Sequence, residues 1–279
     1  MPAAWNRWRL PALLGAGLAA SALLYASRIE PRWLRVRYVP VRLPRLHPAF
    51  HDYRIVHFSD IHMGGGMSPA RLRDAVGLVN ALRPDLVALT GDFIHADGAA
   101  AADLTGALKA LRARDGVVAV LGNHDYRRAA GAVRRALAEA GVLELSNAVH
   151  TLRRGAGCLH IGGVDDVAAG RDCLDAVLAA LPAEGAAVLL AHEPDFADIS
   201  APTGRFDLQL SGHSHAGQVR LPLAGALVLP SYGKHYPAGR YQVGDMVQYT
   251  TSGLGTIWPH LRFNARPEVA VLILEAAQP

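Results

Sequence analysis

The sequence has few cysteines, no internal repeat and no overall excess of positive charge beyond its first 54 residues. Its two cysteines, Cys158 and Cys173, are too few for a disulfide framework and form no Cys-x-x-C pair, so we expect two small, partly buried side chains. Low-complexity tracts, heptads and fixed-period repeats are absent, which excludes a coiled coil or a solenoid. At 279 residues and 51% hydrophobic content, the chain is long enough for one substantial core.

Charge is distributed unevenly along the chain. The first 54 residues contain nine arginines and two acidic residues, whereas the remainder contains 19 basic and 22 acidic side chains. The formal net charge of +4 therefore divides into +7 and −3. Because the larger part carries no excess of positive charge, it offers no extended surface for a nucleic-acid backbone, and we expect no nucleic-acid partner.

One uncharged segment, residues 10–27, lies between the N-terminal arginines and reads LPALLGAGLAASALLYAS. Eighteen residues rising about 1.5 Å each span roughly 27 Å, which is enough to cross the hydrocarbon core of a bilayer. We predict a transmembrane anchor or signal-anchor here, between a basic N-terminus (1–9) and a basic juxtamembrane arm (28–52). A cleaved signal peptide is the alternative, although Leu24-Tyr25-Ala26 is a poor cleavage site.

The arginines also bear on orientation. Six follow the apolar segment between residues 28 and 45, against two before it, and the positive-inside tendency then predicts a cytoplasmic C-terminal domain. The same six could instead hold the arm against anionic headgroups, so export stays open as an alternative. No twin-arginine pair precedes the segment, which disfavours one export route.

Beyond the arm, short apolar runs alternate with helical patterns. We predict strands at 54–59, 86–90 and 117–121 and helices at 68–82, 101–112 and 127–140, an order that indicates an α/β fold. Ser68 and Pro69 have the residue types of an N-cap and a first turn. Further strands at 142–145, 159–162, 187–191, 208–211, 247–251 and 269–274 accompany one helix at 173–181, which favours more antiparallel pairing in this half.

These elements predict that residues 53–279 form a four-layer α/β/β/α sandwich of two mixed sheets flanked by helices, preceded by the N-terminal membrane helix. Polar clusters follow several of the strands directly. They are Asp60-Ile61-His62, Gly91-Asp92, Gly122-Asn123-His124-Asp125, His192-Glu193 and Gly212-His213-Ser214-His215. Because the loops after strands form the ligand crevice of α/β sheets, we expect these clusters to converge into an active site.

The side chains of these clusters suit metal binding. Asp60 and His62 are two residues apart at a strand end, so both can point to one side, and His213 and His215 repeat the spacing. The carboxylate of Asp92 can bridge two ions. The full candidate set is Asp60, His62, Asp92, Asn123, His192, His213 and His215. Its mixture of nitrogen and oxygen donors favours two divalent ions of Mn, Fe or Zn over Ca.

The ordered series D-x-H, G-D, G-N-H-D, H and G-H-x-H resembles the motifs of the calcineurin-like phosphoesterase superfamily over about residues 53–275. Three later pieces, Gly212 to Gln218, Gly253-Leu254-Gly255 and Arg262-Phe263, resemble a subgroup of membrane-associated bacterial phosphodiesterases. That subgroup includes enzymes that cleave UDP-2,3-diacylglucosamine in lipid A synthesis. The resemblance implies an inner-membrane, dinuclear metal-dependent hydrolase of a phosphodiester or pyrophosphate, on a lipid-linked or nucleotide-sugar-lipid substrate, by attack of a metal-bridging hydroxide.

The resemblance also implies roles for individual residues. Asp60, His62, Asp92 and His215 would hold one metal, and Asp92, Asn123, His192 and His213 the other. The catalytic residue would be His124, which would protonate or stabilise the leaving-group oxygen, with Asn123 and His124 both contacting the substrate. Two departures are Ala216, where the subgroup often has Gly, and His124 itself, where dedicated cytoplasmic lipid A hydrolases carry Arg. The second leaves the exact lipid substrate open.

Other residues carry weaker expectations. The remaining histidines, at positions 47, 51, 57, 95, 150, 160, 235 and 260, are expected to be surface or core residues. Asp125 is expected to support the site rather than bind metal. Weak candidates for substrate contact are Lys234, His235, Arg240, His260 and Arg262.

Three alternative functions stay open. Gly212 to Ala216 nearly matches the G-x-S-x-G elbow of a serine hydrolase around Ser214, but the last glycine is missing and no helix pattern follows. A non-catalytic, membrane-tethered binding module is the second alternative. A broad-specificity phosphodiesterase or nuclease is the third.

Overall fold

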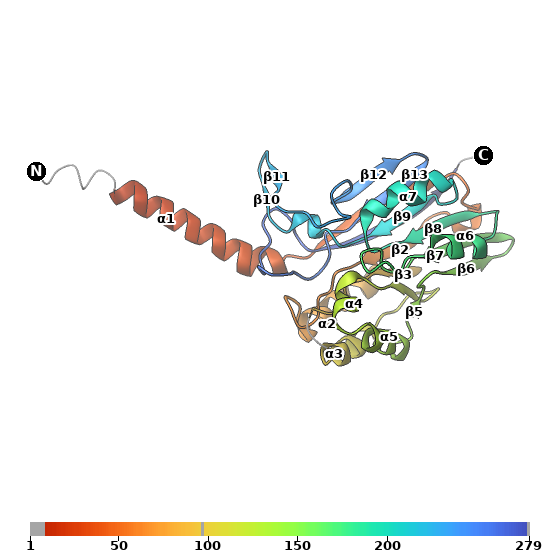
Figure 1. The fold of residues 1–279 in the computed structure, drawn as a ribbon, viewed down its shortest axis with the longest axis horizontal. Coiled ribbons are helices and arrows are strands. Elements are labelled where there is room, and N and C mark those ends of the chain that lie inside the picture. The colour runs from red at the N-terminus through yellow and green to blue at the C-terminus, as the bar shows by residue number, and fades with distance from the viewer. Residues whose placement is uncertain (1–8, 96–97, 278–279) are drawn as a thin grey trace, which may run out of the picture.

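Two six-stranded sheets form the centre of the structure, a computed structural model that describes residues 9–95 and 98–277 (Figure 1). The first sheet has the order β1-β14-β2-β3-β4-β5, and the second has the order β12-β13-β9-β8-β7-β6. The strands of the first sheet are β1 (Arg35–Leu43), β14 (Glu268–Ala276), β2 (Tyr53–Phe58), β3 (Leu86–Thr90), β4 (Val117–Val120) and β5 (Leu143–Glu144). Those of the second are β12 (Gly239–Val243), β13 (Met246–Thr250), β9 (Leu208–Ser211), β8 (Ala186–Leu190), β7 (Gly157–Gly163) and β6 (Ala148–Arg154).

Both sheets mix parallel and antiparallel pairs. In the first sheet β2, β3 and β4 run parallel, and β14 pairs antiparallel with β2. In the second sheet β7, β8, β9 and β13 run parallel, with β6 and β12 as antiparallel edges. The central parallel strands are apolar throughout because both of their faces are covered, as β3 (LVALT) and β8 (AAVLL) show.

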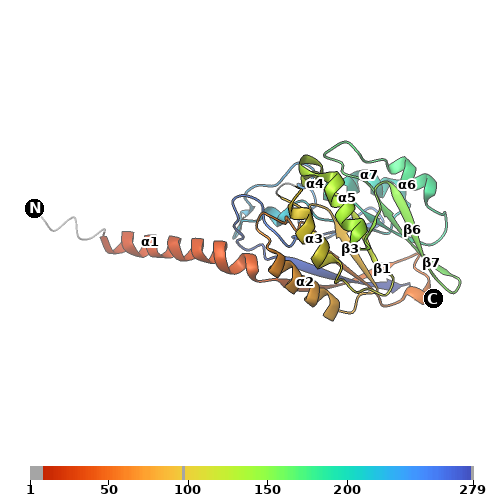
Figure 2. The same cartoon turned by 90° about the horizontal axis from the view of Figure 1, so that it is seen from below.

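Helices cover the two outer faces (Figures 1 and 2). The outer face of the first sheet packs against α2 (Pro69–Ala81), α3 (Ala100–Leu108) and α5 (Ala130–Glu139). The outer face of the second packs against α6 (Leu174–Ala180) and α7 (Ala197–Ser200). The predicted α/β/β/α sandwich is thereby confirmed.

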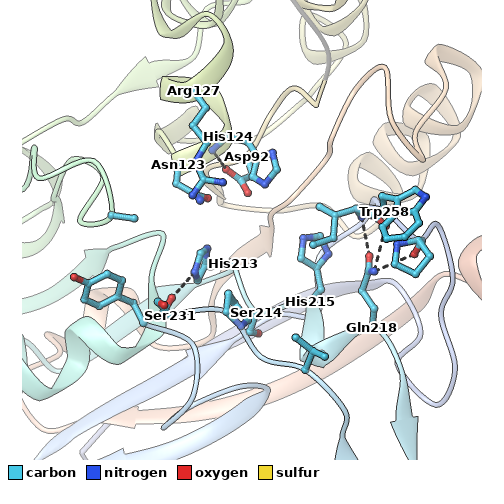
Figure 3. Close-up of a pocket in the computed structure, with 17 residues that line it drawn as sticks. Asp92, Asn123, His124, Arg127, His213, Ser214, His215, Gln218, Ser231 and Trp258 are labelled. Atoms are coloured by element: carbon cyan, nitrogen blue, oxygen red, sulfur yellow. Dashed lines mark hydrogen bonds between the residues drawn. The ribbon is translucent and has the colours of Figure 1, made fainter.

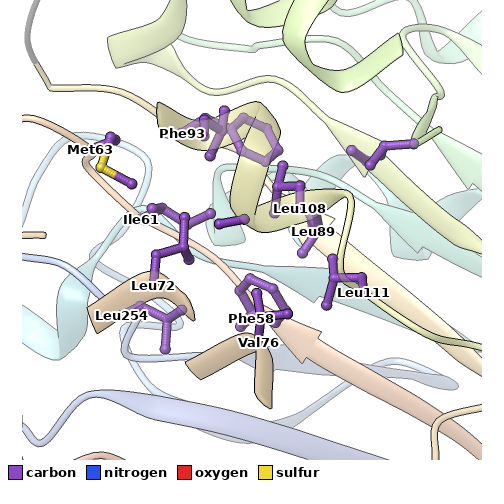
Figure 4. Packing of buried hydrophobic residues seen from close by; sticks show 14 of the residues in the cluster. Phe58, Ile61, Met63, Leu72, Val76, Leu89, Phe93, Leu108, Leu111 and Leu254 are labelled. Carbon is purple, nitrogen blue, oxygen red and sulfur yellow. The ribbon is translucent and has the colours of Figure 1, made fainter. Parts of the chain in front are cut away.

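Strand alternation divides the apolar residues between the layers. On β2, Ile55 lies in the core between the sheets, whereas its neighbour Val56 lies in the core under the helices. Figure 4 shows this second core, where Phe58 and Leu89 of the first sheet face Leu108 of α3. The register of the central strands is therefore strongly specified. A shift by one residue would move the side chains packed between the sheets to the helix-covered face, and those of the helix-covered face to the space between the sheets.

Of two helices expected from the sequence, one is confirmed and the other is divided. The helix expected at 68–82 is confirmed as α2, and the hydroxyl of Ser68 accepts a hydrogen bond from the backbone N–H of Arg71 (3.3 Å). The helix expected at 127–140 is instead two helices, α4 (Asn123–Arg128) and α5, separated at Ala129, whose backbone leaves the helical region (φ −165°, ψ 60°). The first of the two begins earlier than expected because Asp125 accepts from the backbone N–H of Gly122 (3.0 Å) and caps it.

The expected anchor lies in α1 (Arg9–Leu24), which continues through a π turn to Ile29 and a 3₁₀ turn to Arg32. The helical stretch Pro11–Arg32, at 22 residues, is long and apolar enough to cross a membrane, and only 6% of its most apolar window is buried. It projects away from the rest of the molecule in both views (Figures 1 and 2). The helix thus extends past the expected end at Ser27, because the buried Glu30 carboxylate accepts from the backbone N–H groups of Asn264 (2.9 Å) and Ala265 (2.5 Å).

The expected juxtamembrane arm, 28–52, is not separate from the globular part. Within it β1 pairs in parallel with β14 over nine residues, and Val39, Val41 and Leu43 lie in the core between the sheets. Pro40 is tolerated in this strand because β1 is an edge of its sheet. The folded unit therefore begins before residue 53, and the sequence reading of 28–52 as an arm was wrong for this strand.

Candidate metal centre

The polar clusters expected to converge do meet at one end of the sandwich. They follow β2, β3 and β4 of the first sheet and β8 and β9 of the second. The carboxyl ends of these parallel strands point to the same edge, so loops from both sheets face one another there. All seven side chains expected as metal ligands are buried at this edge.

The first group of side chains is Asp60, His62 and His215. The Nε2 atoms of the two histidines are 3.0 Å apart, and the Oδ1 atom of Asp60 lies 3.4 Å from Nε2 of His215 and 4.0 Å from Nε2 of His62. One ligand atom from each of the three residues lies within 4.8 Å of the others, which is close enough for all three to hold one ion.

The second group is Asp92, His192 and His213. Nε2 of His192 lies 3.4 Å from Oδ2 of Asp92 and 3.2 Å from Nδ1 of His213. The same Oδ2 atom also lies 3.5 Å from Nε2 of His62, in the first group. Asp92 therefore lies between the two groups, where one carboxylate can serve two ions.

Backbone carbonyls fix which ring nitrogens face this second group. Nδ1 of His192 donates to the carbonyl of Thr90 (2.7 Å), and Nε2 of His213 donates to the carbonyl of Ser231 (2.8 Å). Because a carbonyl can only accept, the opposite nitrogen of each neutral ring carries a lone pair, and these two lone pairs face each other. A cation between them turns this unfavourable contact into two bonds.

Protonation differs between the histidine rings of the two groups. Burial lowers the pKa of His62 to about 3 and that of His213 to about 4, so both rings are neutral at neutral pH. Burial opposes the charge on His192 as well, but the carboxylates of Asp92, Glu193 and Asp60 together outweigh burial and raise its pKa. A proton and a metal ion therefore compete for Nε2 of His192.

Several atoms at this edge have no hydrogen-bond partner within the described residues. These buried atoms are Oδ1 of Asn123 and the Nδ1 atoms of His62, His95, His124 and His215. Burial also raises the pKa of Asp60 to about 7, because a buried carboxylate is costly without a cation. The donor set thus fits divalent ions: it offers carboxylates, an amide oxygen and imidazole lone pairs, and no arginine or lysine forms an ion pair with Asp60 or Asp92 in the described ranges.

The backbone at the site is strained. Five of the seven residues have positive φ, between 50° and 68°, where non-glycine residues are disfavoured: Asp60, His62, Asp92, His213 and His215. Gly91 also has positive φ (83°), and a Cβ atom there would lie 2.7 Å from both Gly122 N and His192 Nδ1. The loops can approach this closely only because glycine has no side chain.

Two buried side chains hold the loops in place. Asp125 accepts from the backbone N–H groups of Phe93 (2.8 Å), Ile94 (3.2 Å) and Gly122 (3.0 Å), so it ties the loop after β3 to the loop after β4. Its geometry agrees with the supporting role expected from the sequence. Arg262 is fully buried and donates to backbone carbonyls of residues 252, 253, 255 and 265. The expectation that Arg262 contacts substrate is therefore wrong, because its side chain is buried and each of its three nitrogens donates to a carbonyl inside the fold.

His124 lies at the rim of the metal groups. Its backbone N–H donates to Oδ1 of Asp92 (2.8 Å), and its ring is 4.8 Å from that of His62. Burial lowers its pKa. A further histidine, His95, stacks on it at 5.4 Å, and one ligand atom from each of His62, His95 and His124 lies within 4.8 Å of the others. Sequence reasoning missed His95, although its place three residues after Asp92 in one loop was a usable signal.

A pocket of about 550 Å³ opens beside these residues (Figure 3). Its polar wall includes Asp92, Asn123 and His124, together with the guanidinium-bearing Arg127. Its other wall is largely apolar, and it includes Val228, Pro230, Tyr232, Ile257 and Trp258. The pocket can therefore take a ligand that has a charged group at one end and an apolar group at the other.

The remaining candidates lie elsewhere. Lys234, His235 and Arg240 do not line the pocket, and Nδ1 of His235 instead contacts Oδ2 of Asp198 (2.7 Å). The ring of His260 lies 6.0 Å from that of His95.

The serine-hydrolase alternative finds no support in the geometry. The hydroxyl of Ser214 donates to the carbonyl of Pro237 (2.5 Å), and no histidine is hydrogen-bonded to it in the part of the chain that the structure describes. Without a base to accept its proton, this hydroxyl is not an activated nucleophile.

Comparison with known proteins agrees with this geometry. Residues 53–217 match the model of the calcineurin-like phosphoesterase family. The chain is 33% identical to the metallophosphoesterase YkuE of Bacillus subtilis, over 97% of this chain and 98% of that protein. It is 30% identical to the phosphodiesterase YaeI of Escherichia coli, over 91% and 93% of the two chains. Over a shorter segment, the chain is similar to the UDP-2,3-diacylglucosamine pyrophosphatase LpxG of Chlamydia muridarum. The two are 37% identical over 40% of this chain and 35% of that protein.

The side-chain groups lead to a prediction about metal content. We expect the purified full chain to bind two Mn²⁺ ions, and Asp92→Ala to reduce the binding at both positions because its carboxylate lies between them. At 100 times the dissociation constant, bound ion adds about 2.7 kcal/mol to the free energy of unfolding, so chelation should lower the melting temperature measurably. Metal analysis and thermal unfolding in detergent measure the two effects. His235→Ala is the matched control, and equal metal content in Asp92→Ala and wild type would contradict the assignment.

Proposed function

Because the chain belongs to the calcineurin-like phosphoesterase family, we propose that this metal-dependent hydrolase cleaves a phosphodiester or pyrophosphate group carried by a lipid or a nucleotide-sugar lipid. The observation that carries the proposal is the pocket itself, which joins the two metal-binding groups to an apolar wall. A second observation supports it, since the stretch Pro11–Arg32 is long and apolar enough to cross a bilayer.

The proposed ligands form two sets, one for each ion, which follow the two groups of side chains at the site. Asp60, His62, Asp92 and His215 would hold one ion, and Asp92, Asn123, His192 and His213 the other. Mn, Fe or Zn fits this mixture of imidazole, carboxylate and amide donors. When bound, two such ions lower the pKa of water and offset the negative charge of phosphoryl oxygens.

The protein groups around the pocket would bind and orient the phosphate. Arg127 and Asn123 line the polar wall and offer donors to phosphoryl oxygens. His124 lies on the same wall, and a bound phosphate anion favours the protonated form of its ring. We propose that His124 then either donates its proton to the oxygen of the leaving group or, while still protonated, stabilises the negative charge that develops on that oxygen.

The substrate class follows from the shape of the pocket. Its apolar wall, with Ile257 and Trp258, suits acyl chains rather than the charged backbone of a nucleic acid. The Chlamydia muridarum relative carries the name of a pyrophosphatase of UDP-2,3-diacylglucosamine, which combines a pyrophosphate with two acyl chains. We propose a substrate of this kind, and hence a role in lipid A biosynthesis.

A panel of substrates tests this proposal. We expect Mn²⁺-loaded enzyme to cleave UDP-2,3-diacylglucosamine faster than phospholipids, and phospholipids faster than DNA, because only the lipids can use the apolar wall. Product release per minute in detergent micelles, at equal substrate concentrations, is the measurement. Faster cleavage of DNA than of every lipid would instead support a broad-specificity phosphodiesterase or nuclease.

His124 gives a second prediction. We expect His124→Ala to lower kcat by about 10²–10⁴-fold on substrates with an alkoxide or phosphate leaving group, since general-acid help is worth that much. The loss should be much smaller with bis(p-nitrophenyl) phosphate, whose leaving group is stable without a proton. Ser214→Ala is the matched control and should keep wild-type activity. An equal loss of kcat on both substrate types would contradict the proposal that His124 transfers a proton to the leaving group.

The proposed location is the inner membrane of a bacterium, with the catalytic part on the cytoplasmic side. The exposed Arg28 and Arg32, at the domain end of the helical stretch, favour that side by the positive-inside tendency. We therefore expect a C-terminal green fluorescent protein fusion, which does not mature after Sec export, to fluoresce in cells. A C-terminal alkaline phosphatase fusion is the paired control, and activity of that fusion would place the domain outside.

A further inference from the structure

The segment from Leu221 to Gly233 contains no charged residue, reads LPLAGALVLPSYG and lies between Arg220 and Lys234. It includes the tip of a small hairpin formed by β10 (Arg220–Leu221) and β11 (Gly225–Ala226). The structure leaves its large apolar side chains in the open: Leu223 and Val228 have relative exposures of 110% and 75%. Several such side chains on one short segment indicate a surface that is covered by something else. We call Leu221 to Val228 the apolar hairpin.

The backbone conformation at the tip of the hairpin is a second sign that an apolar partner covers it. Leu223 has φ 68°, in the left-handed region that a large side chain disfavours and that glycine or asparagine adopts more readily. An exposed leucine in that conformation is unfavourable both for the backbone and for solvation in water. Transfer of the side chain into an apolar environment would remove the solvation cost and offset the backbone cost.

Contacts place the hairpin next to the end of α1. The ring of Tyr25 packs edge-on against Phe263 (6.2 Å), and the backbone N–H of Arg262 donates to the carbonyl of Ala26 (2.8 Å). Phe263 in turn accepts from the backbone N–H of Arg220 (2.9 Å), at the base of the hairpin. Figure 1 shows the hairpin at the end of the molecule from which α1 emerges. A bilayer entered by α1 therefore lies beside the apolar hairpin.

The charged and aromatic residues around this end suit a membrane surface. Arg28 and Arg32 are exposed at the end of the helical stretch. Trp33 follows them, half exposed, and the guanidinium of Arg266 lies 4.0 Å from the centre of its ring. Arginine beside tryptophan is the composition found where proteins meet the headgroups of a bilayer. The surface around the hairpin thus matches a lipid partner in charge as well as in apolarity.

The same segment forms a wall of the catalytic pocket. Val228 and Pro230 line the pocket together with Trp258, which is 80% exposed. Gln218, two residues before β10, connects the hairpin to the segment that carries Trp258. Its side chain donates to the carbonyls of Ile257 (3.2 Å) and Pro259 (3.3 Å) and accepts from the N–H of Ile257 (2.8 Å), as Figure 3 shows in part. The apolar surface is therefore continuous from the hairpin to the pocket.

We propose that the apolar hairpin and Trp258 form a second membrane contact, which enters the surface of the same leaflet as α1 and holds the mouth of the pocket against the headgroups. The proposal rests on the membrane-bound, lipid-cleaving function given above. It adds that a lipid substrate reaches the polar wall by sliding along Trp258 and Val228, with its acyl chains never fully exposed to water. The bilayer, rather than a protein, is the partner.

Depth-dependent quenching tests the contact directly. The full chain, with Cys158→Ser and Cys173→Ser, would carry a single bimane-labelled cysteine from Leu223→Cys, in vesicles of phosphatidylcholine and phosphatidylglycerol at a ratio of about 3:1, a composition that supplies anionic headgroups. Because an interfacial segment lies roughly 5–10 Å deep, a lipid with a nitroxide near its headgroup should reduce this fluorescence about twofold or more. The matched control is Ile199→Cys, an exposed apolar position on α7, where no quenching is expected. Equal, weak quenching at both positions would overturn the proposal.

Activity provides the second measurement. Leu223 and Leu227 do not line the pocket, so Leu223→Asp with Leu227→Asp should leave hydrolysis of water-soluble bis(p-nitrophenyl) phosphate unchanged. Hydrolysis of UDP-2,3-diacylglucosamine in vesicles should fall about tenfold or more, because two carboxylates resist entry into the leaflet. Ile199→Asp is the control and should affect neither substrate. An equal loss on both substrates, or no loss on either, would overturn the proposal.

The two measurements separate this inference from the proposed function. If wild-type enzyme cleaves the soluble diester but no lipid, the proposed substrate is wrong. The quenching at position 223 still decides whether the hairpin touches the bilayer, because it requires no turnover.

Discussion

The structure depends on one electrostatic constraint: buried imidazole lone pairs and carboxylates face one another at the edge where the two sheets meet. Nε2 of His192 and Nδ1 of His213 lie 3.2 Å apart, with the carboxylate of Asp92 next to them. Such a group is unfavourable unless a cation occupies its centre. The fold holds it together because the side chains come from loops anchored on buried parallel strands, which cannot move apart without exposing both apolar cores.

Much of the surrounding structure serves this constraint. The loops approach each other through glycines such as Gly91, and buried Asp125 ties two of them by hydrogen bonds to the backbone. Buried Arg262 holds the backbone of the loop after β13, where Gly253 packs against Asp60. Because these contacts are made by the protein alone, they would reduce the reorganisation needed for metal binding. Arg262 also connects this edge of the sandwich to the N-terminal helical stretch, since its backbone N–H donates to the carbonyl of Ala26.

Local patterns were reliable where burial and chemistry coincide along the chain. All nine strands expected from the sequence are present, and eight of them carry apolar runs that are largely buried. The ninth, β5, is a short edge strand whose Leu143 is exposed. The seven metal-ligand candidates also meet, since each follows a strand directly and strand ends share an edge. Five strands of the described residues were missed: β1, which carries Pro40 and exposed arginines, β6 and β12, which are edges with polar residues on one face, and the two-residue strands β10 and β11. Their strand character comes from pairing with a neighbour rather than from their own composition.

The sequence by itself determined the layered α/β fold, the apolar N-terminal helix and the candidate metal ligands, because apolar periodicity and the choice of donor atoms are local properties. Only the tertiary structure decided that 35–43 belongs to the sheet, that His95 joins the site and that Arg262 is buried rather than facing substrate. It alone placed the apolar hairpin between the pocket and α1. These depend on contacts between residues far apart in the chain, such as Arg220 with Phe263 and Glu30 with Ala265, which no local pattern encodes.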